Sequence, residues 1–133
     1  MNSISSIFDP LDWNEPEEIQ EKGMEAASHV ADISIFLQPL FPEYNKNVWD
    51  NCARILSRKS DKALEPYLYE LLEWLQDMNW PGAFCILDRL QRFSDKTILQ
   101  TAIGKSMENA QTNYDEVWKE NLTMLADSLY CNL

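Results

Sequence analysis

Apolar residues recur along this chain every three or four positions, which is the spacing of helices with one buried face. No stretch alternates apolar and polar residues as a strand would, and glycine occurs at only three positions. We predict that the first ordered helix begins at Asn14 as its N-cap, with Glu17 completing a capping box, and runs to about residue 38. Trp13, just ahead of it, is either a hydrophobic staple or part of a binding surface. The apolar stripe of this helix consists of Ile19, Met24, Ala27, Val30, Ile33 and Leu37.

Two prolines within residues 38–44 (QPLFPEY) end that helix, and a second helix is predicted from Asn45 or Asn47 to Ser57. A leucine-rich stretch follows, in which Pro66 is expected to interrupt or restart the helix. Its apolar residues cover a wide arc over residues 64–78, which predicts a central helix that is buried on more than one side. Three further helices are predicted to begin at Pro81, at Ser94 or Asp95, and at Asn113 or Asp115.

Residues 70–82 read ELLEWLQDMNWPG, with two tryptophans on either side of a polar break. A residue before proline avoids the helical region, so Trp80 cannot continue a helix into Pro81. Because Pro81 suits the first turn of the next helix, we predict a tight corner with Asn79 or Trp80 as the cap. Trp74 is predicted to lie in the core, whereas Trp80 either packs over the corner or stands exposed as a binding anchor.

Together these elements predict an all-α fold, a compact stack of about six helices in antiparallel hairpins with a HEAT- or ARM-like helical-repeat architecture. A chain of 133 residues is long enough for one domain with a core and short for two. We therefore expect a single domain over residues 1–133, with an acidic helix over residues 14–38 as its N-terminal part.

Charge is unevenly distributed along the chain, which has a formal net charge of −11. Residues 1–45 hold nine acidic residues against one basic residue, a net charge of −8. Residues 46–105 hold eight against nine, and residues 106–133 hold five against one. Phosphate backbones and anionic membranes would repel such a chain, so direct nucleic-acid or membrane binding is not expected. A basic protein partner would be attracted, unless the acids serve only to keep the protein soluble.

The cysteines Cys52, Cys85 and Cys131 are odd in number, widely spaced and in no CxxC pair. This pattern predicts reduced thiols in a cytoplasmic protein. No basic residue precedes an apolar stretch at the N-terminus, so no secretory signal is expected. No apolar run approaches the roughly 20 residues that span a bilayer. We expect a cytoplasmic protein, and a monomer.

One candidate metal site can be drawn from the spacing. Glu25, His29 and Asp32 would share one face of the predicted helix, and carboxylates with an imidazole can bind a metal ion. The alternative is a polar helix face. His29 is the only histidine, so the usual zinc ligand sets cannot be built from nearby residues.

Other catalytic arrangements are missing from the sequence. The isolated glycines form no phosphate-binding loop, and no GxSxG occurs. Glu70 and Glu73 are expected on an exposed helix edge, where solvated acids are common. The basic stretch from Arg54 to Lys62 is expected to complete a helix C-terminus. We predict no cofactor and no enzymatic activity, which leaves a binding protein as the favoured class.

The run ELLEWLQDMNWPG resembles the signature of a small, uncharacterised bacterial family of helical domains. Members carry a leucine-rich helix, then WLQDMNWP, then a second helix, and near the C-terminus an acidic-Trp-Lys element. Here Asp115-Glu116-Val117-Trp118-Lys119 stands in that place, and the resemblance covers residues 46–125. Some members are described as immunity proteins of contact-dependent growth inhibition or similar toxin systems. The resemblance thus implies a small cytoplasmic protein that occludes a toxin domain.

Acidity and resemblance lead to one hypothesis, an immunity protein that binds and neutralises a toxin domain with the basic cleft of a nuclease. The candidate contact residues are Glu15, Glu17, Glu18, Glu21 and Glu25, then Trp80, and then Asp115, Glu116 and Glu120. The first alternative is a helical-repeat adaptor with another protein partner. The second is a metal-dependent enzyme that uses the candidate metal site.

Overall fold

The computed structural model describes residues 4–40 and 46–130. Helices dominate both ranges, and neither contains a strand, which confirms the all-α class. The α-helices are α1 (Ile4–Phe8), α2 (Glu17–Ser28), α3 (Trp49–Ser57), α4 (Asp61–Leu64), α5 (Leu68–Glu73), α6 (Ala83–Gln91), α7 (Lys96–Thr112) and α8 (Glu116–Tyr130). Short 3-10 helices between them are η1 (Asp9–Leu11), η2 (Ile33–Phe36), η3 (Gln38–Leu40), η4 (Lys46–Val48), η5 (Glu65–Tyr67) and η6 (Trp74–Gln76). In the described ranges, the helices are too short or too polar to cross a bilayer.

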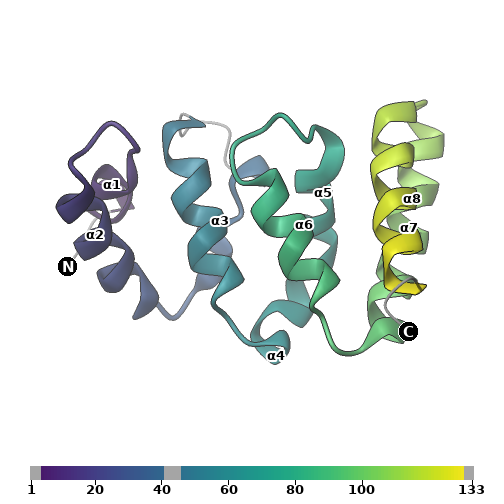
Figure 1. The fold of residues 1–133 in the computed structure, drawn as a ribbon, viewed down its shortest axis with the longest axis horizontal. Coiled ribbons are helices and arrows are strands. Elements are labelled where there is room, and N and C mark those ends of the chain that lie inside the picture. The colour runs from purple at the N-terminus through teal and green to yellow at the C-terminus, as the bar shows by residue number, and fades with distance from the viewer. Residues whose placement is uncertain (1–3, 41–45, 131–133) are drawn as a thin grey trace.

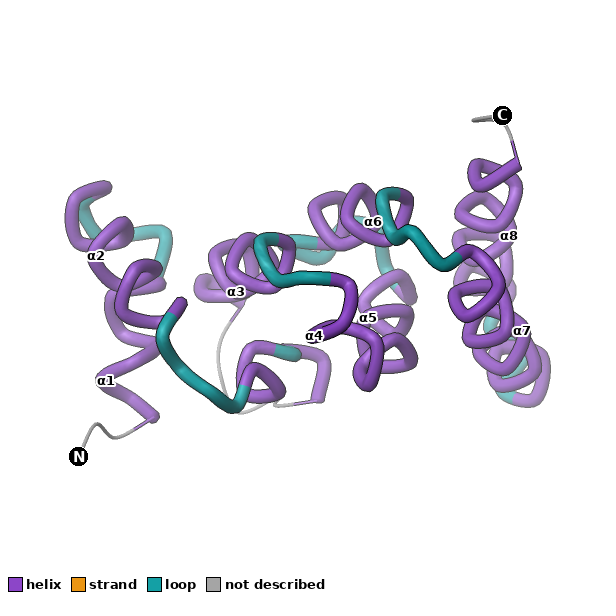
Figure 2. Tube along the Cα trace, turned by 90° about the horizontal axis from the view of Figure 1, so that it is seen from below, coloured by secondary structure: helices purple, strands orange, loops and turns teal. Residues whose placement is uncertain are grey.

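The helices are arranged in two layers along one long axis. Figure 2 shows α2, α3, α6 and α8 in one layer and α1, α5 and α7 in the other. Contacts join α3 to α6, α5 to α7 and α7 to α8. In Figure 1 the helices α1 and α2 lie at one end of the long axis, and α7 and α8 lie at the other. The two acidic parts of the sequence are therefore far apart in space.

The leucine-rich segment crosses the middle of the core. Leu68, Leu71, Leu72 and Leu75 are all buried, and burying a leucine side chain contributes about 1.5 to 3 kcal/mol. Pro66 lies in η5, where its ring and missing N–H prevent continuous α-helical bonding. The predicted central helix is divided into α4, η5, α5 and η6, and the expected interruption at Pro66 is confirmed.

The start of the N-terminal helix differs from the prediction. α2 begins at Glu17 with Pro16 in the N-cap position, so Asn14 is not the cap and there is no capping box. Pro16 explains the difference, because a residue before proline avoids the helical region and Glu15 therefore stays outside the helix. The backbone N–H of Asn14 instead donates to Asp12 Oδ1 at 2.8 Å. α1 and η1, which precede this turn, were not predicted.

Hydrogen bonds attach this N-terminal part to α3. Asn51 is buried, and its Nδ2 donates to the carbonyl of Leu11 at 2.8 Å and to Gln20 Oε1 at 2.9 Å. The backbone N–H of Trp13 donates to the carbonyl of Asn47 at 3.1 Å. Trp13 is itself about half exposed. A hydrophobic staple would use the residue just before the N-cap, and that residue is Glu15, so Trp13 does not act as the staple of α2.

The corner before α6 is tight, as predicted, but its cap is different. The carbonyl of Asp77 accepts a bond from the N–H of Trp80 at 3.0 Å, and its side chain accepts one from the N–H of Asn79. The N-cap of α6 is Gly82, with a φ of +86°, rather than Asn79 or Trp80. Pro81 therefore lies before the helix and not in its first turn.

Close packing against α3 explains the glycine at this corner. A Cβ atom on Gly82 would lie 2.7 Å from the Ala53 Cβ and 3.0 Å from the carbonyl oxygen of Trp49. Trp74 is fully buried, as predicted, and its Nε1 donates to the carbonyl of Pro81 at 2.9 Å. The tryptophans of the WLQDMNWP signature therefore build the junction between α3, η6 and α6.

Two side chains of the basic stretch from Arg54 to Lys62 make polar contacts, one of them at the end of a helix. Lys59 Nζ donates to the carbonyl of Ser28, the last residue of α2, at 3.0 Å. Arg54 lies 3.6 Å from Asp50 on its own helix. The expectation that this stretch completes a helix C-terminus is therefore confirmed for Lys59 alone, and the helix that Lys59 caps is a neighbouring one.

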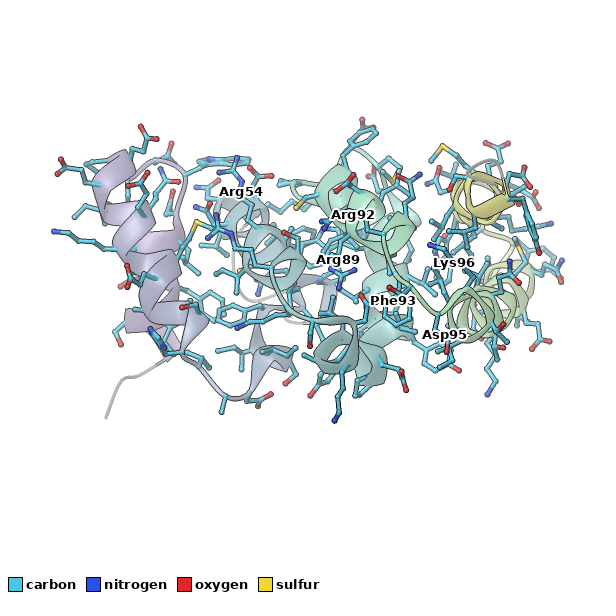
Figure 3. The ribbon with its side chains drawn as sticks, turned by 60° about the horizontal axis from the view of Figure 1, so that its bottom comes forward. Arg54, Arg89, Arg92, Phe93, Asp95 and Lys96 are labelled. Carbon is cyan, nitrogen blue, oxygen red and sulfur yellow. The ribbon has the colours of Figure 1, made fainter. Side chains whose placement is uncertain are left out.

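A second polar cluster joins three segments beneath α6. Arg89 is only 6% exposed, and its guanidinium donates to the carbonyl of Lys59 and to the carboxylate of Asp61. The other carboxylate oxygen of Asp61 accepts the N–H of Ser94 at 2.9 Å. Figure 3 shows Arg89 between α3 and α6, whereas Arg92 lies on the outside of α6. This cluster fixes the turn into α4 against the turn into α7.

Candidate partner-binding site

A shallow groove with a volume of about 820 Å³ lies along α8. Two of the predicted contact residues, Glu116 and Glu120, line it. The full lining consists of Gln91, Glu116, Lys119, Glu120, Thr123, Met124, Asp127 and Ser128. We call this surface the α8 groove.

Specific hydrogen bonds hold α8 in place. Asp115, the third predicted residue of this region, caps the helix by accepting the N–H of Trp118 at 3.0 Å. Trp118 is buried, as predicted, and its Nε1 donates to the carbonyl of Leu72 at 3.0 Å. Asn121 Nδ2 donates to the carbonyl of Leu75 at 2.7 Å. One face of α8 is thus fixed to α5 and η6, and its acidic face is left to solvent.

The α8 groove is lined by three carboxylates and one base, Lys119. Lys119 Nζ lies 3.6 Å from Glu116 Oε1, in a pair open to solvent. Glu120 and Asp127 form no ion pair within the described residues. Met124 is 45% exposed and adds apolar surface among these charges. The arrangement fits a partner that presents cationic side chains beside apolar ones.

Asp127 and Met124 were not among the predicted contact residues. The sequence could have indicated Asp127, since Glu116, Glu120 and Asp127 are spaced to lie on one side of a helix. Gln91 comes from α6, and its place in the groove depends on the packing of α6 near α8.

The N-terminal acids form a separate surface. Glu15, Glu17, Glu18, Glu21 and Glu25 are all exposed. Of these, Glu18, Glu21 and Glu25 surround a hollow of about 370 Å³ on α2, together with Lys22. Because α2 and α8 lie at opposite ends of the molecule (Figure 1), the predicted contact residues do not form one continuous site.

Trp80 belongs to neither acidic surface. Its ring is partly buried and meets the Trp49 ring edge to face, with 5.4 Å between the ring centroids. Lys46 Nζ lies 5.7 Å from the Trp80 ring and 5.5 Å from the Trp49 ring. The structure therefore places Trp80 in the packed corner, which was one of the two predicted alternatives.

A model of one protein family matches residues 45–130 of the chain. Its description is DUF5071, a domain of unknown function. The chain belongs to this family. No curated protein and no solved structure matches the chain.

The DUF5071 domain contains the signature corner and the α8 groove. It spans η4 to α8, close to the predicted range of 46–125. The α1–α2 segment lies outside the matched residues, and so do all five N-terminal glutamates. Of the two surfaces formed by the predicted acidic contact residues, the α8 groove is thus the one within the family domain.

The candidate metal site is not assembled. α2 ends at Ser28, so Glu25, His29 and Asp32 do not share a helix face. The Asp32 side chain instead caps η2 by accepting the N–H of Ser34 at 3.1 Å. Among the described residues, no three histidines, cysteines or acids are grouped closely enough to hold a metal ion. The metal site from which the alternative of a metal-dependent enzyme was predicted is therefore not formed by these three residues.

The described thiols lie in poor positions for a nucleophile. Cys52 is fully buried, and burial raises its pKa far above the ordinary value. Burial also raises the pKa of Cys85, against the opposing effect of a hydrogen bond with Ser57. A thiol with a raised pKa holds little of the reactive thiolate near neutral pH. Cys131 lies outside the described residues.

Glu70 and Glu73 are not on an exposed edge, contrary to the prediction. Both are partly buried, and one carboxylate oxygen of Glu70 is buried without a hydrogen-bond partner among the described residues. Burial raises the pKa of Glu73, and the nearby charge of Glu70 raises it further. Glu73 lines a hollow together with residues of α7, so the packing of α7 on α5, which the sequence does not show, accounts for its burial.

We expect Glu73→Gln to stabilise the fold at pH 7. Because the pKa of Glu73 is higher in the folded protein, its ionisation disfavours the folded state. This penalty develops as pH rises from the unfolded pKa through the folded pKa. Urea unfolding should therefore show a gain for the variant at pH 7 and none near pH 3, where both states are protonated. An equal gain from Glu65→Gln, which alters an exposed acid, would contradict this explanation.

Proposed function

We propose that this protein is an immunity protein that binds a bacterial toxin domain and occludes its active site. The observation that carries the proposal is the α8 groove, in which Glu120 and Asp127 form no ion pair with any described residue and lie beside the exposed Met124. The resemblance of residues 46–125 to a family with members described as immunity proteins supports it. The proposal includes a cytoplasmic location, where such a toxin would act.

A basic nuclease domain is the proposed partner. A cleft that binds phosphates holds lysines and arginines, and these would match the carboxylates of the α8 groove. Electrostatic attraction of this kind speeds association and weakens as salt is added. The acids of α2 would add long-range attraction even if they make no contact. In this proposal the net charge of −11 attracts the basic partner as well as keeping the protein soluble.

A rescue experiment tests the function itself. The C-terminal domain encoded by the gene immediately upstream is expressed in a host cell, with and without this protein. Death without it and survival with it would support the proposal. An upstream product that is harmless, or that kills in both cases, would remove the proposal's main support.

The groove is tested by the double variant Glu120→Gln/Asp127→Asn. We expect this variant to bind the toxin domain of the rescue experiment about tenfold to a hundredfold more weakly, because two cationic groups of the partner lose their counter-charges. The matched control is Asp50→Asn/Asp88→Asn, which makes the same change in net charge on α3 and α6. Titration calorimetry at moderate salt measures both. Equal losses in the two variants would mean that only total charge matters, and would contradict a role for the groove.

The alternative is a helical-repeat adaptor. From α5 to α8 the helices alternate between the two layers (Figure 2), which supports a HEAT- or ARM-like repeat, and such stacks commonly offer extended surfaces to protein partners. An adaptor would bind more weakly than a toxin inhibitor, and would not rescue cells from the upstream product. Affinity and rescue together therefore separate the two functions.

A further inference from the structure

A second groove lies between α5 and α7, in the opposite layer from α8. It consists of two hollows of about 300 and 310 Å³, and Tyr69 lines both. One half is largely apolar, with Leu68, Ile98 and Ala102 in its lining. The other half contains Glu73, Lys105 and Glu108. The two hollows meet at Tyr69, and together we call them the α5/α7 groove.

The ring of Tyr69 already holds a cation. Lys105 Nζ lies 5.8 Å from the ring centroid, within the range of a cation–π contact. Tyr69 is 41% exposed, so part of the ring remains accessible. At an exposed site this contact contributes only about 0.5 to 1 kcal/mol, and another cation can displace the lysine.

Carboxylates outnumber the bases around this ring. Glu73 and Glu108 line the acidic half and Glu65 lines the apolar half, whereas Lys105 is the one base among the lining residues of the two hollows. None of these three glutamates forms an ion pair within the described residues. The residues that line the groove therefore carry more negative than positive charge.

We propose that the α5/α7 groove binds an arginine side chain from a helical segment of a partner protein. The guanidinium stacks on Tyr69 in place of Lys105 and pairs with Glu73, while an apolar side chain of the same segment fills the half lined by Leu68 and Ile98. Arginine fits better than lysine, because its planar group stacks on an aromatic ring and donates two parallel bonds to a carboxylate. This site does not depend on the α8 groove or on the partner being a toxin.

The spacing of the two halves defines the ligand further. Ile98 and Lys105 mark the halves along α7, and seven residues of a helix rise about 10 Å. A partner helix with a leucine and an arginine at positions i and i+7 would place one side chain in each half.

The probe is a neutral peptide helix of alanine and glutamine that carries one leucine and one arginine about seven positions apart. A control peptide has citrulline in place of arginine, which keeps the shape and removes the charge. Both are titrated at low salt into the isotope-labelled full-length protein, and NMR follows the backbone amides and the Glu73 carboxyl carbon. We expect saturable changes at Tyr69, Ala102 and Lys105 with a dissociation constant below about 1 mM, and a lower pKa of Glu73 in the complex.

Two variants make the test specific. Glu73→Gln, which is expected to remain folded, should weaken binding by about tenfold, and Glu120→Gln in the α8 groove should leave it unchanged. Citrulline should weaken binding to a similar extent. The proposal is overturned if the citrulline peptide binds equally well, if no saturable change occurs, or if the changes are confined to residues 116–128. A failed rescue with successful peptide binding would refute the immunity function and keep this site.

Discussion

Replacing Gly82 with alanine is expected to lower the free energy of unfolding by about 2 to 5 kcal/mol. Gly82 has a φ of +86°, a region that costs an L-residue about 1 to 2 kcal/mol. The new methyl group would also lie 2.7 Å from the Ala53 Cβ and 3.0 Å from a backbone oxygen, where nothing can yield cheaply. Relief of that overlap would push α6 away from α3. Urea unfolding followed by circular dichroism measures the change.

Gly104→Ala is the matched control for this substitution. Gly104 lies inside α7, and a Cβ atom there would meet nothing within 4 Å. The same chemical change should therefore stabilise the protein by about 0.5 to 1 kcal/mol, because alanine favours the helix. Similar effects of the two variants would show that close packing of α6 on α3 is not what requires Gly82.

Arg89→Met is expected to lower the free energy of unfolding by about 2 to 4 kcal/mol. Methionine keeps most of the buried stem and removes the guanidinium. The carbonyl of Lys59 and the carboxylate of Asp61 then lose their donor in a partly dry site. Arg92→Met removes an arginine from the same helix, but its 3.0 Å pair with Asp88 is 57% and 67% exposed, so a loss of less than about 0.5 kcal/mol is expected. Comparable losses in the two variants would show that Arg89 contributes only as surface charge.

Acid unfolding gives an independent measure of the same cluster. Burial alone would raise the pKa of Asp61, but hydrogen bonds from Ser94 and Arg89 outweigh it and lower that pKa. The stabilisation by this carboxylate is therefore present above its unfolded pKa and lost as pH falls through the folded pKa. In Arg89→Met this acid-dependent loss should be smaller than in the unaltered protein.

Local signals predicted several helix boundaries. Asp95 and Asp115 each accept a backbone N–H at the start of α7 and α8, as their place in the sequence indicated. Such caps depend on a few neighbouring residues, so a sequence pattern is sufficient to find them. The break at Pro66 in the leucine-rich segment was also predictable, because the effect of a proline ring on a helix is local.

The wrong N-cap of α2 had a local cause in Pro16, but other errors arose where distant segments decide the local structure. The preference of proline for a first helical turn favoured Pro81 as the start of α6, but the approach of Ala53 and Trp49 imposed Gly82 as the cap. The candidate site shows the same difference between what the sequence indicates and what only the packing of distant segments decides. Glu116 and Glu120 were chosen because the C-terminal part of the sequence is acidic, whereas the burial of Glu73 became visible only once α7 was placed beside α5.

The indole of Trp118 reaches back 46 residues along the chain to the carbonyl of Leu72, and Asn121 makes a similar bond to Leu75. These carbonyls lie where α5 passes into η6, so the end of the central segment is completed by the last helix. In a stack whose units bond only to their neighbours, the terminal unit can fray while the rest stays folded. Here the loss of α8 would leave buried carbonyls of the central segment without donors. The C-terminal helix thus closes the stack, and it ties the unfolding of the α8 groove to that of the core.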